Sequence, residues 1–438
     1  MLRTLSAVLS LLLAVIITGS AQSREPAAPY GKHIVVNDVS WPASLPDPAL
    51  TVFPDLDAKR QVQTPKGAER EAIRQLESTI RELESAGGPY AVGLGEPLGD
   101  LARQLVAQGR LAEALSLFQR SLHILRINSG LSSPGQMTVL RSMLQLQRAL
   151  GDREALDDLY GYYYRLGWLA ADDQSSDEPW QVALEYLRWQ REQIRAEPRG
   201  DVDRELLALH GLNERLLEQA AEEQAAPSVR RELARSQLRN LYLLRDRVRP
   251  VAVSEPFSVL TRRRNRPREM LSEDIYRDRL LSLWRSAVKS GSDLLAAQAA
   301  RVESRVARAE LYRDIGDWEQ WNGTWRRAQA AWRRAFELLE EEGQGELIQA
   351  WFGEPVELPD NGVFWQPDAA GDAARVQITF DVSAQGRARS IDARVISGRD
   401  GASVTAVREL RAVRFRPRFQ GGEAVASKDA VREYQVYR

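Results

Sequence analysis

Apolar residues recur at helical spacing through most of the chain, from about residue 67 to residue 345. Large apolar side chains return there every three to four positions, which places them on one face of a helix. Short stretches rich in Gly, Pro, Ser and Asp interrupt the pattern and are typical of turns. They lie at residues 87–89, 132–134, 172–179, 197–200 and 249–250, with an irregular stretch at 250–267. The sequence therefore predicts an array of consecutive helices over residues 67–345.

One part of this region has the arrangement of a two-helix repeat. Large apolar residues on one predicted helix precede a turn glycine, and a small, an aromatic and a small residue follow on the next helix. These residues are Leu98, Leu101, Ala102, Leu105, Gly109, Ala114, Phe118 and Ser121. Small residues let two helices approach closely, and the aromatic ring fills the space beside the next unit. The pattern resembles the tetratricopeptide repeat.

Two looser copies of this repeat follow. The second joins Leu140, Met143 and Leu144, through Gly151-Asp152, to Leu156, Tyr160 and Tyr163. The third joins Ala309 and Tyr312, through a turn predicted at Gly316-Asp317-Trp318 with extra residues around 321–324, to Ala328, Trp332 and Ala335. Residues 67–345 are therefore interpreted as a tetratricopeptide-like array, and residues 346–374, with several prolines, as a linker or docking segment.

After Gly371 the apolar period changes from 3.6 to 2, which is the period of a half-buried strand. The alternation predicts strands over residues 376–382 and 391–395, joined by a turn at 384–386. A short helix is expected from Ser403 to Val413, followed by a Gly421-Gly422 turn and a last strand near 431–437. The fold class expected for the whole chain is therefore a helical array followed by a small α+β domain with the order strand, strand, helix, strand.

Residues 375–438 resemble the TonB C-terminal domain family. The resemblance rests on Phe380-Asp381-Val382 with Gly386-Arg387, on Arg414-Phe415-Arg416-Pro417 followed by Gly422, and on the closing strand with Tyr434 and Val436. It implies a domain that binds outer-membrane transporters by adding an extended peptide to an open sheet edge. Carried to this chain, the candidate edge is the last strand, with Arg432, Tyr434 and Val436 on one face. The alternative interpretation is that these residues only complete the sheet.

The beginning of the chain has the pattern of a secretory signal. Arg3 precedes an apolar run over residues 5–18, and small residues at 19–21 suit cleavage after Ala21. The run is shorter than the roughly 18 to 20 residues that span a bilayer. Residues 1–21 are therefore predicted to be a signal peptide and residues 22–66 an extended lead-in rich in Pro and Ala. The alternative is an uncleaved anchor in the inner membrane, which alone would give the protein a membrane contact.

The same pattern bears on energy transduction. The resemblance implies that a TonB-type transducer needs a permanent membrane helix with a histidine and a long Pro-rich rod. Here the apolar run has no histidine and a helical array stands in place of the rod. A transducer or transport accessory, anchored by an uncleaved N-terminus, is therefore the alternative interpretation, and an interaction protein of the periplasm is the preferred one.

Composition limits the chemistry further. The chain has no cysteine, which excludes disulfides, thiolate metal sites and a cysteine nucleophile. Its net charge is −1, but residues 375–438 carry 13 Lys and Arg against 7 Asp and Glu. In an exported protein this basic domain suggests lipid headgroups or acidic protein surfaces as partners, and not nucleic acid. A solvated basic face is the simpler explanation.

Candidate catalytic groups are sparse. The three histidines, His33, His123 and His210, lie in three separate segments, and none of the sequence motifs of hydrolases, zinc proteases or nucleotide-binding loops occurs. No catalytic residue, metal or cofactor is predicted. An envelope hydrolase with a helical scaffold stays open as an alternative of another class, although no motif supports it.

Aromatic side chains gather in three places, around residues 160–168, 180–189 and 318–332. Aromatic residues usually fill the space between stacked helices, but they also line grooves that bind peptides or sugars. Tyr162 and Trp321 fall off the core positions of their predicted helices, so they are the candidates for partner contact. The sequence as a whole predicts a non-catalytic interaction protein of the periplasm. Its expected partners are envelope proteins, among them an outer-membrane transporter or a second copy of the chain.

Overall fold

The computed structural model describes residues 29–30, 34–36, 67–170, 177–196, 202–248, 268–364 and 374–436, with side chains from residue 67 on except at 268–274. Several features predicted from sequence lie outside these residues: the signal at 1–21, most of the lead-in at 22–66, the irregular stretch at 250–267, His33, and Tyr437.

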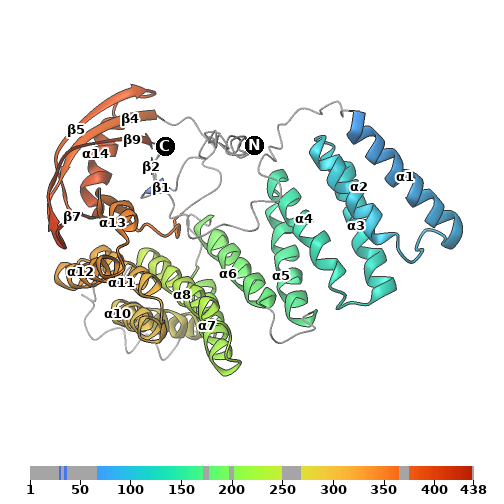
Figure 1. Cartoon of the computed structure of the whole chain (residues 1–438), viewed down its shortest axis with the longest axis horizontal. Helices are drawn as coiled ribbons and strands as arrows, with labels where there is room; N and C mark the ends of the chain where they lie inside the picture. Colours follow the sequence, from blue (N-terminus) through green and yellow to red (C-terminus); the bar gives the residue numbers. More distant parts are fainter. Residues whose placement is uncertain are drawn as a thin grey trace, which may run out of the picture.

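Helices make up the described chain from residue 67 to residue 352 (Figure 1). They are α1 (Gly67–Gly87), α2 (Gly95–Ala107), α3 (Leu111–Ser129), α4 (Gly135–Leu150), α5 (Arg153–Leu169), α6 (Glu178–Ala196), α7 (Asp203–Glu222), α8 (Pro227–Arg247), α10 (Arg268–Arg301), α11 (Arg305–Trp321), α12 (Trp325–Glu341) and α13 (Gly345–Phe352). None of the helices in this part of the chain combines the length and the apolar character that a membrane span requires.

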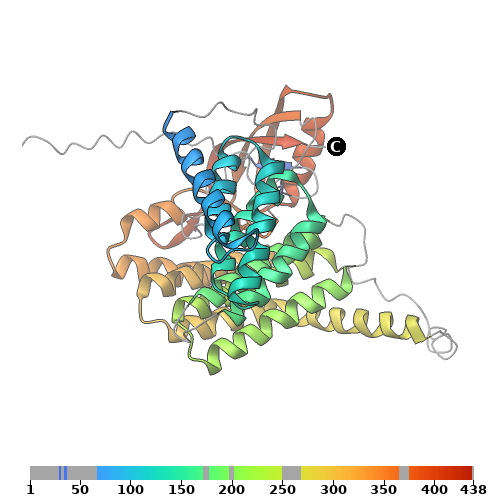
Figure 2. The ribbon, with the colours of Figure 1, turned by 90° about the vertical axis from the view of Figure 1, so that its right-hand side faces the viewer.

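Consecutive helices pack on each other from α1 to α12, and α6 and α7 also contact α8 and α10, respectively, so the later helices do not form a simple row (Figure 1). Figure 2 shows the long helix α10 running past the body of the molecule at one end. Apolar side chains between the helices form several separate core clusters along the array, as expected when each helix buries one face on the next. The predicted order, a helical array followed by a small sheet domain, is confirmed.

The first two repeat-like copies are helix pairs. Gly109 in the turn between α2 and α3 has a φ of 78°, a conformation that favours glycine. Gly151 ends α4 with a φ of 74°, and the Asp152 carboxylate accepts a hydrogen bond of 3.1 Å from the Ala155 N–H at the start of α5. Ala114, Phe118 and Ser121 are completely buried against the preceding helix.

The turn of the third copy lies later than predicted. Residues 316–318 are inside α11, which continues to Trp321, and the turn is at Asn322–Thr324, where Gly323 has a φ of 89°. Gly316 is required for packing instead. A Cβ at this position would come within 2.3 Å of the Trp332 indole ring of α12. The missing side chain therefore lets Trp332 lie directly on α11.

We expect Gly316→Ala to destabilise the protein by about 1–3 kcal/mol, because the ring of Trp332 has to move in a packed core. The matched control is Gly211→Ala in α7, where the nearest atom to an added Cβ is the end of the Arg215 side chain at 3.6 Å. There alanine should stabilise the helix by up to about 1 kcal/mol, since only helix propensity changes. Urea unfolding followed by tryptophan fluorescence measures both; equal effects of the two substitutions would contradict this role of Gly316.

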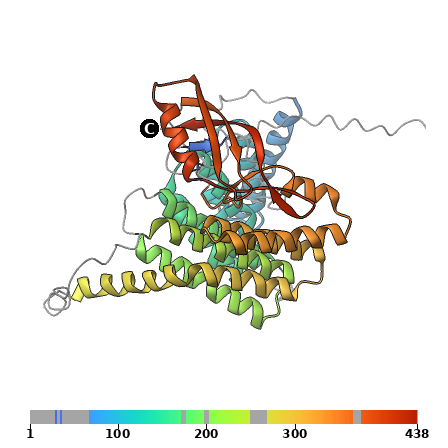
Figure 3. The same cartoon turned by 90° about the vertical axis from the view of Figure 1, so that its left-hand side faces the viewer.

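The C-terminal domain is an antiparallel sheet covered by one helix (Figure 3). Its elements are β4 (Ala374–Val382), β5 (Ala388–Ser397), α14 (Ala402–Ala412), β6 (Arg414–Arg416), β7 (Arg418–Gln420), β8 (Glu423–Val425) and β9 (Ser427–Val436). The order strand, strand, helix, strand is as predicted, and α14 begins after Gly401, close to the expected cap. A hairpin of β7 and β8 around Gly421-Gly422 was not predicted as a pair of strands.

Alternation along β4 sets the core of this domain. Ala374, Val376, Ile378, Phe380 and Val382 are all buried, and they pack with Ala406 and Leu410 of α14 and with Phe415 of β6. The intervening residues of β4 are exposed or half-buried. A period-2 pattern of this kind therefore identified the buried face of the sheet from sequence alone.

The segment after α12 belongs to the packed structure as far as residue 364. α13 buries Trp351 and Phe352 against α12 and against Phe419 of β7. β3 (Val356–Leu358) then pairs with β6 of the C-terminal domain. Residues 345–358 therefore contact both the helical array and the sheet domain.

Candidate functional site

The last strand was predicted to be an open sheet edge, and this is wrong for its C-terminal end. Two short strands from the beginning of the chain, β1 (Pro29–Tyr30) and β2 (Ile34–Val36), extend the sheet, whose order is β1-β2-β9-β4-β5 (Figure 1). β2 runs antiparallel to β9, with Ile34 opposite Val436 and Val36 opposite Tyr434. The edge is occupied because an apolar, β-branched stretch of the lead-in pairs with it, at about 400 residues of chain separation.

Arg432, Tyr434 and Val436 do lie on one face, as predicted. Opposite them on β4 are Ile378, Val376 and Ala374, all on the core side of the sheet. Tyr434 and Val436 are 1% exposed, so their side chains are part of the core and only their main-chain groups can pair with another strand. Arg432 is half-buried, with its guanidinium 3.6 Å from the exposed Glu354 carboxylate.

Beneath this edge lies a buried carboxyl group. The Tyr434 hydroxyl donates a hydrogen bond to Oε1 of Glu357 on β3, and Glu357 is 6% exposed. Within the described part of the chain its other oxygen, Oε2, has no hydrogen-bond partner. Burial raises the pKa of Glu357 to about 7, although the hydrogen bond from Tyr434 and the nearby charge of Arg432 oppose this. The group thus titrates near neutral pH at the junction of β9 with β3.

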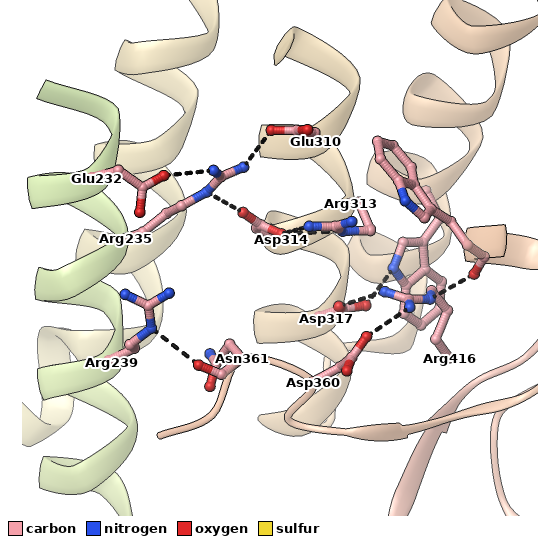
Figure 4. A network of polar contacts seen from close by, with 12 residues as sticks. Glu232, Arg235, Arg239, Glu310, Arg313, Asp314, Asp317, Asp360, Asn361 and Arg416 are labelled. Atoms are coloured by element: carbon pink, nitrogen blue, oxygen red, sulfur yellow. Dashed lines mark hydrogen bonds and ion pairs between the residues drawn. The ribbon is translucent and has the colours of Figure 1, made fainter. Parts of the chain in front are cut away.

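Arg416, the last residue of β6, connects the sheet domain to the helices (Figure 4). It is 2% exposed. Its Nη1 lies 2.6 Å from Asp317 of α11, its Nη2 lies 3.2 Å from Asp360, and its Nε donates to the Trp351 carbonyl at 3.0 Å. One side chain thus contacts the array, the loop after β3, and α13.

The carboxylates around Arg416 are held away from water. Burial raises the pKa of Asp360 to about 6 and also raises that of Asp317, and Arg416 offsets only part of this in each case. Asp317 additionally accepts a hydrogen bond of 2.9 Å from the Trp332 indole N–H. An ion pair so deeply buried is sensitive to the loss of either partner.

A second set of ion pairs adjoins the first in Figure 4. Arg235 of α8 lies within 2.9 Å of Glu232, Glu310 and Asp314, and Arg313 also donates to Asp314. Burial opposes ionisation of Asp314, but the two guanidinium groups more than offset it and lower its pKa. Every carboxylate labelled in Figure 4 is hydrogen-bonded to a guanidinium. The arrangement suits the fixing of helices and sheet in one orientation better than proton transfer to a substrate.

Tyr162, on α5, lies away from this junction, whereas Trp321, on α11, packs beside it against the apolar cluster that contains Trp332 and Phe352. The Tyr162 hydroxyl donates to Gln136 at 2.6 Å, and the Arg126 guanidinium lies 4.3 Å from the centre of its ring. Trp321 ends α11 and packs edge-on against Tyr242, with ring centres 4.8 Å apart. Both side chains are half-buried between helices. Their role in partner contact stays a prediction.

The two described histidines do not form a site together. His123 is exposed on α3 and packs against the Tyr90 ring, whereas His210 is buried in α7 next to Gln237. Among the residues with described side chains, no group of three or more His, Asp or Glu is placed to hold a metal ion.

The residues that join the domains were not predicted from the sequence. Arg416 stands in the motif used for the resemblance, but its carboxylate partners Asp317 and Asp360 are 99 and 56 positions away. Glu357 looks like an ordinary polar residue of a Pro-rich segment. The only signal in the sequence is the alternation of apolar Val356 and Leu358 with Glu357, which indicates a short strand but does not identify its partner.

The chain matches no protein-family model, and a search of curated proteins finds no significant match.

Proposed function

We propose that this protein is a non-catalytic interaction protein of the bacterial periplasm, and that its C-terminal sheet binds partners by strand addition along β9. One observation carries the proposal. The edge of β9 holds an extended segment from a distant part of the chain, so its main-chain groups are placed to accept a strand. The periplasmic location rests on the predicted signal at residues 1–21.

Two resemblances belong to the same proposal. The order of β4, β5, α14 and β9 is compatible with a TonB C-terminal domain, and the hairpins α2–α3 and α4–α5 are compatible with tetratricopeptide-like repeats. In this view the helical array contacts one partner and the sheet another. Support for a rigid scaffold comes from the Arg416 ion pairs, which hold the sheet on the array.

Site-specific photo-crosslinking in intact cells tests the proposal. A photoreactive amino acid at Val431 places the probe on β9, where the native side chain is 50% exposed, and one at Ile396 places it on the opposite edge strand β5, where the native side chain is 46% exposed. We expect a discrete crosslinked envelope protein from position 431 and none from position 396. Fractionation should recover the protein with the periplasm. Equal crosslinking at both positions, or none at either, would refute binding along β9.

A further inference from the structure

The edge of β9 that faces away from β4 is longer than β2, the strand that pairs with it. β9 pairs with β4 in unbroken register from Ala430 to Val436. On the other side β2 covers only Tyr434–Val436, and no other strand in the described ranges pairs with the remainder of this edge. An extended segment longer than β2 can therefore pair with residues from Ala430 on.

The opposite edge of the sheet is protected against such pairing. β5 has an irregularity at Ser390, whose φ is 49°, and the register of β4 with β5 shifts nearby. Exposed charged residues alternate along it, namely Arg389, Asp392 and Arg394. Charges and irregularities of this kind prevent the addition of strands. Strand addition is therefore favoured at β9.

The register at β9 also specifies what fits. Residues directly opposite each other in an antiparallel pair direct their side chains to the same face. An incoming strand thus has two positions, separated by one residue, on the core side opposite Tyr434 and Val436. In the chain's own segment these positions are 36 and 34, and the sequence has Val and Ile there. The matching ligand is an extended segment with β-branched or other apolar residues two positions apart.

We propose that residues 34–36 are an internal strand that closes the C-terminal end of this edge in the resting chain, and that they leave when an extended partner segment of the same pattern pairs along Ala430–Val436. The inference rests on the proposed function and concerns the regulation of the same site. Three paired residues make a short ladder. Thirty residues, 37–66, separate Val36 from α1 in the sequence, and their contour at full extension is up to about 100 Å.

Because residues 34–36 belong to the same chain, they can occupy the edge although they are only three residues long. A segment on the same chain competes at an effective concentration of about millimolar order. A free segment then binds only to the fraction of molecules whose edge is open, and its apparent affinity falls by that fraction. If the edge is open in about a tenth of the molecules or fewer, removal of the internal strand raises the affinity for a free segment at least about tenfold.

The test uses the purified chain and a fluorescent peptide with the sequence of residues 32–38, KHIVVND. In the variant Val35→Pro/Val36→Pro, one main-chain donor toward β9 is lost whichever of the two faces it, because consecutive N–H groups point to opposite sides of a strand. Anisotropy titrations should show at least about tenfold tighter binding of the peptide to this variant than to the unchanged chain. A peptide with proline at both valine positions serves as the control and should bind neither.

Equal affinity of the two proteins, or no binding to either, would overturn the inference. So would concentration-dependent dimers of the unchanged chain that disappear in the proline variant, because residues 34–36 would then pair with a second copy. If the peptide titrations fail but position 431 still crosslinks an envelope protein in cells, the proposed function stands without the inference. Tighter peptide binding by the proline variant, without any cellular crosslink, would support closure of the edge by residues 34–36 and refute its use by an envelope partner.

Discussion

Arg416→Ala is expected to destabilise the protein by about 3–5 kcal/mol, the range typical of a buried ion pair that loses one partner. The loss of the guanidinium leaves Asp317 and Asp360 buried without their cation, since each lies within 3.2 Å of Arg416. It also removes the donor to the Trp351 carbonyl. Urea unfolding gives the size of the effect, and hydrogen exchange of β3, β6 and α11 shows whether the junction opens first.

Arg418 provides the matched control, because it lies two positions away on β7 and is exposed. Arg418→Ala should change the free energy of unfolding by no more than about 0.5 kcal/mol. The variant Arg416→Met/Asp317→Asn/Asp360→Asn, which removes all three charges, should recover part of the stability, as no uncompensated charge remains buried. Equal effects of Arg416→Ala and Arg418→Ala would show that the ion pairs do not hold the sheet on the helices.

Glu357→Gln is expected to change how stability depends on pH. The pKa of Glu357 is raised from 4.5 to about 7 in the folded protein. The folded state therefore keeps a proton that the unfolded state has lost, and the stability from this group is full below pH 4.5 and is lost as pH rises through 7. Relative to the unchanged protein, the variant should gain about 3 kcal/mol between pH 4.5 and 7.5.

Urea unfolding of both proteins at several pH values measures this difference, and other titrating groups cancel because they are common to the two. Tyr434→Phe is the informative companion, because it removes the hydrogen bond to Glu357 and leaves the carboxyl in place. It should raise the pKa of Glu357 further and extend the loss of stability to higher pH. Parallel curves for Glu357→Gln and the unchanged protein would contradict the assignment of a raised pKa to Glu357.

The helices and the first strand of the sheet domain were predictable because each is determined by the spacing of apolar residues within its own segment. The period of 3.6 over residues 67–345 and the period of 2 over Val376–Val382 each reflect one buried face, and both were found. The prediction of a turn at Gly316 was wrong for a specific reason. Glycine usually ends a helix, whereas here it makes room for the Trp332 ring, and only the contact with α12 distinguishes the two.

Long-range pairing was not accessible in the same way. Residues 34–36 pair with β9, and Arg416 pairs with Asp317. Neither partner can be identified from the local sequence around the other. The face of Arg432, Tyr434 and Val436 was predicted correctly, but whether that face meets a partner or the core depends on α14 and β3. The candidate site therefore remains the main-chain edge of the last strand, without the Tyr434 and Val436 side chains, which are buried.

The most direct test of strand addition is a chain whose edge can be locked. Val35 and Gln435 are register partners, and the chain has no native cysteine, so Val35→Cys/Gln435→Cys introduces one possible disulfide between β2 and β9. With the photoreactive residue at Val431, crosslinking in cells is compared after treatment with a thiol oxidant and after reduction, with each single-cysteine variant as control. Strand addition along the whole of Ala430–Val436, which requires β2 to leave, predicts that the crosslinked partner seen in reduced cells disappears when the disulfide closes, and only in the double variant. Crosslinking that is unaffected by the closed disulfide would contradict it.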